Sequence, residues 1–182
     1  MLKLLQSIVR LFVGLLAVVV LSVAAFDMVV VRPAVSIIES LLSSASADER
    51  NPPAAVSLLM HRFYGEGLKY SVARMVVRSS GELDQRSTSN RQVREIGIGL
   101  LMPLHLSDDQ IQTAFLSQVY MGLKVRGFSQ ASQRHLRTPL AAVSNEQAAK
   151  LVAIASAPTL YLEDPVRLKK QAEYLLSLPP RP

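Results

Sequence analysis

An arginine and a glutamate four positions apart, Arg91 and Glu95, have the clearest potential for chemistry. Further arginines stand in the surrounding sequence, at Arg74, Arg78, Arg86 and Arg94. Such a group can hold an anionic diphosphate electrostatically. The alternative is a solvated basic face, with Glu95 forming an ordinary helix salt bridge to Arg91 at the four-residue spacing. The residues alone leave both interpretations open.

Other chemistries find little support in the sequence. His61, His105 and His135 form no metal-ligand pattern, so surface or packing positions are expected for them. The chain has no phosphate-binding glycine loop and no constellation that would activate a serine or cysteine nucleophile. It also lacks cysteine, which is compatible with an oxidising compartment without identifying one. We therefore expect no metal and no cofactor.

The segment that carries the pair, residues 91–122, is expected to form two helices joined by a short break. Apolar residues recur at helical spacing until Pro103 removes an amide donor. Ser107 then begins a second helix as its cap, with Gln110 as the capping-box partner. We predict that the later helices build the core and that these residues are buried together: Ile96, Leu100, Ile111, Phe115, Leu116, Leu151 and Ile154.

The spacing of this segment resembles the second half of the peptidoglycan glycosyltransferases, glycosyltransferase family 51. That family carries R-K-x-x-E and then S-K-x-x-I-L-E-x-Y-L-N, and the register is matched here by Arg91, Glu95, Ser107, Ile111, Phe115 and Leu116. A later run, G-x-x-x-A-A-x-x-Y-F-G-K, is echoed by Gly127, Ala131, His135, Leu136 and Leu140. Residues 145–151 look like L-T-x-x-E-A-A-x-L-A, and the pairs 157–158 and 164–165 look like Q-x-P and N-P. The resemblance covers roughly residues 91–176.

The resemblance implies a lysozyme-like, all-α fold seated on a membrane, and the joining of a lipid-linked disaccharide to a growing glycan. In the family, a first glutamate within E-D-x-x-F-x-x-H-x-G activates the acceptor hydroxyl as a base. No intact copy exists here, because aligning Phe63 with the aromatic position puts Leu59 and Met60 at the acidic pair. An apolar side chain cannot accept the proton. Glu39 and Glu49 are the weak candidates for a relocated base.

The remaining family motifs are partly kept. The second, G-G-S-T-I-T-Q-Q-L, is matched best with Ser71 at a threonine position and with Arg74 and Met75 in place of the glutamines. The third keeps its arginine and glutamate but has Gln92 for the lysine, which loses a point charge suited to diphosphate. The resemblance thus implies substrate binding by Ser71, Arg74, Arg91 and Glu95.

Two functional classes follow. The first is a shortened family member, a pseudoenzyme of cell-wall biosynthesis, that binds lipid-linked precursor, a glycan strand or a cell-wall synthase without catalysis. The second is an active glycosyltransferase with a displaced carboxylate. An unrelated anchored helical module is a weaker third interpretation.

The amino-terminal segment has the composition of a membrane anchor. Lys3 and Arg10 precede an uncharged run over residues 11–26, and a span of about 20 apolar residues crosses a bilayer core of about 30 Å. A cleavable signal peptide is the alternative, because residues 22–25 are small. The positive flank predicts a cytoplasmic N-terminus and a domain on the periplasmic side of the inner membrane, in a single pass.

Composition agrees with this placement. The chain has 182 residues and a net charge of +6, which falls to about +4 when the four charges up to Arg32 are left out and 17 basic and 13 acidic residues remain. Basic character suits anionic lipid headgroups or a pyrophosphate-bearing lipid, whereas no nucleic-acid motif is present. No strand pattern appears, so the predicted class is all-α. We expect an anchor at 1–32, a helical domain at 33–178 and a proline-rich tail at 179–182.

Helices of that domain are expected near residues 35–42, 53–63, 68–78, 128–137, 144–157 and 165–176, with a polar loop at 79–90.

Overall fold

The computed structural model describes residues 2–79 and 88–179, and side chains from Gln6 onward. Its order is α1 (Leu2–Phe26), η1 (Asp27–Val31), α2 (Arg32–Ser44), α3 (Ala47–Arg50), α4 (Ala54–Phe63), η2 (Gly65–Gly67), α5 (Leu68–Ser79), α6 (Thr88–Leu101), η4 (Met102–Leu104), α7 (Asp108–Gln118), α8 (Phe128–Ala131), η5 (Ser132–Leu136), η6 (Leu140–Ala142), α9 (Asn145–Ser156), α10 (Pro158–Glu163) and α11 (Pro165–Ser177). Within these described ranges there is no strand, only one bridge between Tyr120 and Arg126. The predicted all-α class is confirmed.

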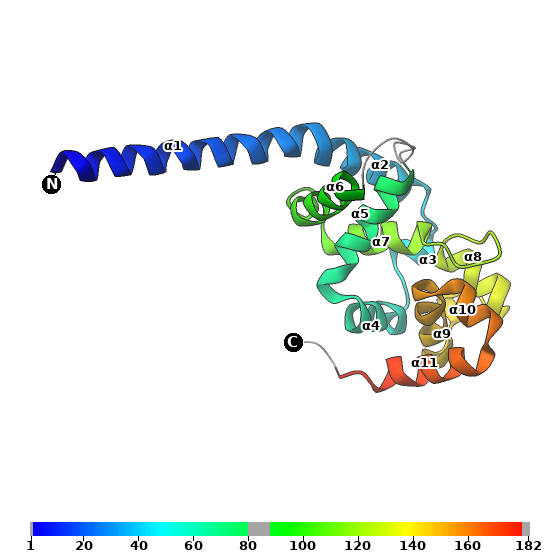
Figure 1. The fold of residues 1–182 in the computed structure, drawn as a ribbon. Coiled ribbons are helices and arrows are strands. Elements are labelled where there is room, and N and C mark those ends of the chain that lie inside the picture. Colours follow the sequence, from blue (N-terminus) through cyan, green and yellow to red (C-terminus); the bar gives the residue numbers. More distant parts are fainter. Residues whose placement is uncertain (1, 80–87, 180–182) are drawn as a thin grey trace.

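Helix α1 extends away from the rest of the molecule (Figure 1). Its described side chains are exposed almost throughout, and it contains 25 residues, so it is about 38 Å long. Within the described residues, the segment 6–44 is long and apolar enough to cross a membrane. A π-helical turn, η1, then leads from α1 into α2 with no break in the helical backbone.

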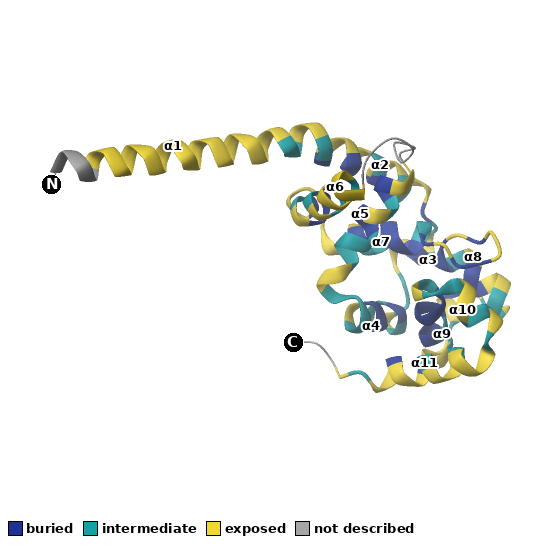
Figure 2. Cartoon of the chain, viewed as in Figure 1, coloured by how far each residue is buried: buried dark blue, intermediate teal, exposed yellow. Residues whose placement is uncertain are grey.

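The remaining helices pack around α7 and α9, which carry a large share of the buried residues (Figure 2). Helix α5 packs on α6 and α7, while α9 packs on α4 and α11. The largest fully buried side chains come from helices on both sides of the domain and include Phe128, Ile38, Met60, Ile98, Met102, Leu116, Leu140, Leu151 and Ile154. One continuous core therefore joins the segment after α1 to the C-terminal helices.

The predicted core is correct for α7 and α9 and wrong for α6. Ile111, Phe115, Leu116, Leu151 and Ile154 are buried, as expected.

Ile96 and Leu100, by contrast, are more than half exposed. The reason is that α6 packs through its glycines: a β-carbon at Gly99 would come within 2.4 Å of the Tyr70 ring, and one at Gly97 within 2.5 Å of Phe26. The close contacts turn Ile98 inward instead, and a search for apolar periodicity does not count glycine as a contact surface.

Local signals at helix ends were more reliable. Ser107 with Gln110 and Ser144 with Gln147 both form the predicted capping boxes. Asp164 accepts hydrogen bonds from two amides at the start of α11, where a helix was expected. Pro158 ends α9 as predicted but also begins α10, a short helix that was not predicted.

The loop expected at residues 79–90 is described only at its ends. Ser79 closes α5, and residues 88–90 already belong to α6, so the helix begins earlier than predicted. Arg86 lies outside the described residues, as do the last three residues of the expected proline-rich tail.

Candidate functional site

The arginine and glutamate of the sequence pair lie on α6 where it packs against α5. Nε of Arg91 is 3.7 Å from Oε1 of Glu95, so the helix ion pair anticipated as the alternative is present. The second oxygen of Glu95, Oε2, accepts a hydrogen bond from Nε of Arg74 on α5 at 3.4 Å. Glu95 therefore bridges two guanidinium groups from different helices. Because its side chain is only 14% exposed, this bridge is shielded from solvent more than a surface pair would be.

A pocket opens next to this bridge, and we call it the arginine pocket. It has a volume of about 350 Å³ and is lined by Tyr64, Ser71, Arg74, Met75, Arg78, Phe115, Val119, Tyr120, Ala155, Ser156 and Pro158. Two guanidinium groups and four hydroxyl groups are among these side chains, and none of the lining side chains is a carboxylate. This composition suits an anion.

Two of the hydroxyls have defined surroundings. Ser71 donates from Oγ to the carbonyl of Gly67 at 3.3 Å, which leaves its lone pairs toward other donors. Tyr64 is mostly buried, and burial raises the pKa of its phenol well above the usual value. It therefore remains a neutral hydrogen-bond donor at physiological pH. The Tyr64 ring also lies 5.0 Å from the Phe115 ring, which connects the pocket wall to the core.

Of the four residues predicted to bind substrate, Arg74, Glu95 and Arg91 are in direct contact, because both arginines pair with the Glu95 carboxylate. Ser71 and Arg74 line the arginine pocket. Arg74 therefore belongs to both sets.

Glu39 and Glu49, the candidate bases, lie elsewhere. Glu39 is exposed on α2 and lines neither of the pockets described here. Glu49 is buried, with 5% exposure.

The buried carboxylate of Glu49 is fully engaged with donors. Its Oε2 accepts from both the amide and the hydroxyl of Ser46 at 3.0 Å, and its Oε1 accepts from the amide of Ser129 at 3.0 Å. It thus caps α3 and α8 together.

The positions aligned with the family's acidic pair are apolar and inaccessible. Leu59 and Met60 lie in the core on α4, at 3% and 0% exposure. Neither can meet an acceptor hydroxyl in solution.

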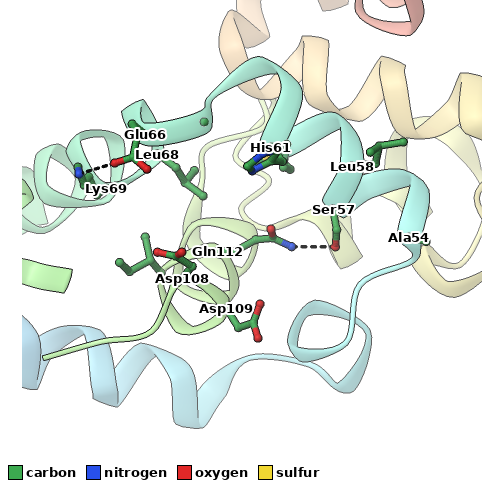
Figure 3. Close-up of a pocket in the computed structure, with 13 residues that line it drawn as sticks. Ala54, Ser57, Leu58, His61, Glu66, Leu68, Lys69, Asp108, Asp109 and Gln112 are labelled. Atoms are coloured by element: carbon green, nitrogen blue, oxygen red, sulfur yellow. Dashed lines mark hydrogen bonds and ion pairs between the residues drawn. The ribbon is translucent and has the colours of Figure 1, made fainter. Parts of the chain in front are cut away.

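A second pocket, the acidic pocket, was not anticipated from the sequence. It has a volume of about 510 Å³ and is lined by Ala54, Ser57, Leu58, Met60, His61, Gly65, Glu66, Leu68, Lys69, Asp108, Asp109, Ile111 and Gln112. Figure 3 shows Asp108 and Asp109 at the start of α7 facing residues of α4 and α5, with Gln112 donating to Ser57 at 2.9 Å. The sequence shows the two carboxylates in the first turn after Ser107 but not the helices that face them.

The ion pair at the edge of the acidic pocket affects two titrations. Glu66 accepts a hydrogen bond from Lys69 at 2.6 Å. This contact lowers the pKa of the Glu66 carboxyl and raises the pKa of the Lys69 ammonium. A base works best with a pKa near the operating pH, so Glu66 is poorly suited to accept a proton from substrate.

Two of the three histidines make structural contacts, and the third, His61, lines the acidic pocket. Nε2 of His105 lies 2.7 Å from Oδ1 of Asp27, and Nε2 of His135 lies 2.9 Å from the carbonyl of Met121. Across the part of the chain that the structure describes, no three His, Cys, Asp or Glu residues gather in a way that could hold a metal ion.

A family model described as Transglycosylase matches residues 69–178, well over half of the chain. The chain belongs to the transglycosylase family. The match extends the expected region of resemblance toward the N-terminus by about one helix, so that α5, with Ser71 and Arg74, lies within it. The resemblance to the peptidoglycan glycosyltransferases and the helical fold expected of a family member are confirmed.

Relatives of this transglycosylase-family chain are penicillin-binding proteins. Penicillin-binding protein 1A/1B of Bacillus subtilis (strain 168) is 27% identical over 111 residues, which is 59% of this chain and 12% of the relative. Penicillin-binding protein 1A of Neisseria gonorrhoeae is 27% identical over 97 residues, covering 52% and 12%. Penicillin-binding protein 2a of Streptococcus pneumoniae (strain ATCC BAA-255 / R6) is 33% identical over 79 residues, covering 43% and 11%. The matched region thus spans only a small part of the length of each relative.

Proposed function

We propose that this transglycosylase-family protein acts in peptidoglycan synthesis by binding the diphosphate of a lipid-linked glycan precursor, without polymerising it. The observation that carries the proposal is the arginine pocket, which Arg74 and Arg78 line together with four hydroxyl-bearing side chains and no carboxylate. Glu95, which pairs with Arg74, lies outside this lining. Arginine suits this ligand because its planar group donates two parallel hydrogen bonds to a phosphate.

The bridge through Glu95 supports binding further. A long side chain loses rotamer entropy when it is fixed by a ligand. Here the carboxylate of Glu95 already orients the guanidinium groups of Arg74 and Arg91, so part of that cost is met before the ligand arrives. One carboxylate shared by two arginines leaves a net positive charge beside the pocket.

The surroundings of the candidate bases support the absence of catalysis. A general base must lie within hydrogen-bond reach of the acceptor hydroxyl and contributes typically about 10²- to 10⁴-fold in rate. Leu59 and Met60 are buried and apolar, Glu39 lines neither pocket, and Glu49 is buried with all three of its donors in place. Turnover near background is therefore expected.

The proposed placement has α1 crossing the inner membrane once, with a cytoplasmic N-terminus and the domain on the periplasmic side. Residues 1–32 would form the anchor, 33–178 the transglycosylase domain and 179–182 a short tail. The apolar length of α1 and the charges at Lys3 and Arg10 support this orientation. Reporter fusions at the C-terminus, one active only in the cytoplasm and one only outside, will test it, and a cytoplasmic signal contradicts it.

The binding test uses full-length protein in detergent and a lipid-linked disaccharide diphosphate. We expect binding that weakens with added salt and is reduced by Arg74→Ala and Arg91→Ala. Arg167→Ala is the matched control, because that arginine is exposed on α11 and pairs with Asp164 at the helix start. Unchanged affinity in both Arg74→Ala and Arg91→Ala contradicts the proposed site.

The second readout of the same samples is polymer. No glycan product is expected from the wild-type protein under conditions in which binding is saturated. Binding without product supports the proposal, whereas absence of both leaves docking to a cell-wall synthase as the role of the domain.

An active enzyme with a relocated base is the second candidate function, and the acidic pocket is the observation that favours it. Asp108 and Asp109 line that pocket from α7 and bring two carboxylates to its wall. Polymer that forms with the wild type and disappears with Asp108→Asn or Asp109→Asn, but not with Glu173→Gln on the exposed face of α11, establishes this function.

A further inference from the structure

The loop between α7 and α8, residues 119–127, is closed by its own hydrogen bonds and anchored in the core. The amide of Met121 donates to the carbonyl of Val125 at 3.0 Å, and the amide of Gly127 donates to the carbonyl of Val119 at 2.9 Å. Met121 and Val125 are also buried, so they fix the loop to the domain. The outward side chains of the loop are therefore held in a defined arrangement.

The outward side of this loop is basic, and a neighbouring segment adds to it. Lys124 and Arg126 on the loop are exposed, as are Arg134 in η5 and Arg137 at its end. Within the described residues, none of these four side chains forms an ion pair. Together with Leu123, we call these residues the basic surface.

One contact holds the two segments of the basic surface together. Nε2 of His135 lies 2.9 Å from the carbonyl oxygen of Met121. Arg134 and Arg137 are one and two positions from His135. Lys124 is three positions from Met121, which limits the separation of these two α-carbons to about 11 Å. Like charges from both segments are thus neighbours, and their mutual repulsion favours an anionic partner.

Leu123 is the apolar member of the basic surface, and its conformation is unusual. Its side chain is 68% exposed, and its φ of 50° lies in the left-handed region, which a bulky residue rarely adopts. In the part of the chain that the structure describes, the non-glycine residues with positive φ are Leu123, Lys124 and Arg137, and all three belong to the basic surface. Such outliers cluster at functional sites. A leucine held outward in this way gains from burial only when a partner covers it.

We propose that the basic surface docks an acidic segment of a protein partner, in which aspartate or glutamate residues flank an apolar side chain. The cations select the acidic residues, and Leu123 packs on the apolar one, as in interfaces whose apolar core has a polar rim. A phosphate polymer uses the cations but offers nothing to Leu123. The fixed loop lowers the entropy cost of binding.

The position of the basic surface agrees with a partner in solution. Figure 1 shows α1 leaving the domain on one side and the loop 119–127, beside α8, on the opposite side. The surface also has no residue in common with the lining of the arginine pocket, so the proposal does not rest on diphosphate binding.

The test measures binding of a labelled peptide to full-length protein in detergent by fluorescence anisotropy. The peptide is Glu-Glu-Leu-Glu-Glu-Leu-Glu-Glu, and a peptide of glutamate alone, of the same length, is the probe without apolar residues. One variant combines Arg126→Glu with Arg134→Glu, and the other is Leu123→Asn, because asparagine tolerates a left-handed backbone. The matched control combines Lys169→Glu with Lys170→Glu, the same change of charge on exposed lysines of α11.

We expect the leucine-containing peptide to bind more tightly than the glutamate peptide, with an affinity that falls as salt is added. The arginine double variant should lose about tenfold in affinity, Leu123→Asn should also bind more weakly, and the lysine control should stay near the wild type. Because the two test variants alter different residues, either one decides the matter if circular dichroism shows that the other is misfolded.

Three results overturn the proposal. Equal losses in the arginine and lysine double variants mean that net charge alone attracts the peptide. Equal affinity for both peptides, with no effect of Leu123→Asn, means that the surface takes any anionic polymer. The third is a wild-type protein that binds neither peptide.

Discussion

The buried carboxylate of Glu49 gives the sharpest test of how this structure assigns roles. Changing Glu49 to Gln replaces one acceptor oxygen with an NH₂ group. In either orientation of the amide, an N–H donor then faces the amide of Ser46 or the amide of Ser129, each of which now donates to an oxygen at 3.0 Å. One charge-assisted hydrogen bond is lost, and one buried donor is left unsatisfied.

The magnitude follows from those two losses. A hydrogen bond to a charged group contributes about 1.5 to 3 kcal/mol, and an unsatisfied buried donor costs about 1 to 3 kcal/mol. Part of the cost is offset because the buried charge also disappears, so we expect a loss of about 2 to 4 kcal/mol. For a chain of this length, that corresponds to a fall in Tm of about 4 to 16 °C.

The assay is thermal unfolding of the full-length protein in detergent, followed by circular dichroism. Glu39→Gln is the matched control, because it makes the same chemical change on an exposed face of α2 and should stay within about 0.5 kcal/mol of the wild type. Equal melting temperatures for Glu49→Gln and wild type refute the structural role. A variant that keeps its stability but loses polymer formation instead identifies Glu49 as a relocated base.

Three further predictions rest on single contacts. Phe115→Ala should lower the free energy of unfolding by about 3 to 5 kcal/mol, because the ring is buried, whereas Leu100→Ala in detergent should change it little. If the two variants lose similar amounts of stability, Leu100 belongs to the core and the prediction is wrong. Lys69→Ala should raise the pKa of Glu66 toward its ordinary value of 4.5, as followed by NMR titration of the carboxyl. Because the pKa of Glu66 is lowered in the folded state, the ion pair stabilises the fold at pH values above the ordinary pKa, and this stabilisation is lost as the pH falls through the lowered pKa. If Lys69→Ala leaves the pKa of Glu66 unchanged, the pair does not form. Ser144→Ala should cost about 0.5 to 2 kcal/mol in urea unfolding through loss of the cap, and Ser144→Asp should restore most of it; a stability equal to wild type means that the capping box contributes nothing.

The sequence was sufficient for features that depend on neighbours along the chain. The capping serines Ser107 and Ser144 were found because each pairs with a residue three positions later. The contact of Arg91 with Glu95 was likewise predictable from the four-residue spacing. Phe115 and its neighbours in α7 were placed correctly because Ile111, Ala114 and Phe115 recur at helical spacing.

Features that join distant segments were not predictable in the same way. The acidic pocket depends on α7 meeting α4 and α5, and nothing near Asp108 in the sequence indicates that meeting. Arg74 was proposed from a family motif, but its contact with Glu95 crosses 21 residues. The outward face of α6 was missed because its packing surface contains Gly97 and Gly99, whose lack of a side chain is what permits close contact.

The link from Glu49 to Ser129 also bears on the order in which the protein can fold. The two residues are 80 positions apart, and synthesis at about 5 to 20 residues per second separates them by about 4 to 16 s. During that interval α2 and α3 exist without the amide that completes their carboxylate, and the buried residues of α2 lack the later helices of the core. Contacts of such long range slow folding, because a large loop must close before they form. The part of the domain nearest α1 is therefore made first and completed late, and it remains exposed to chaperones and proteases until α8 has been made.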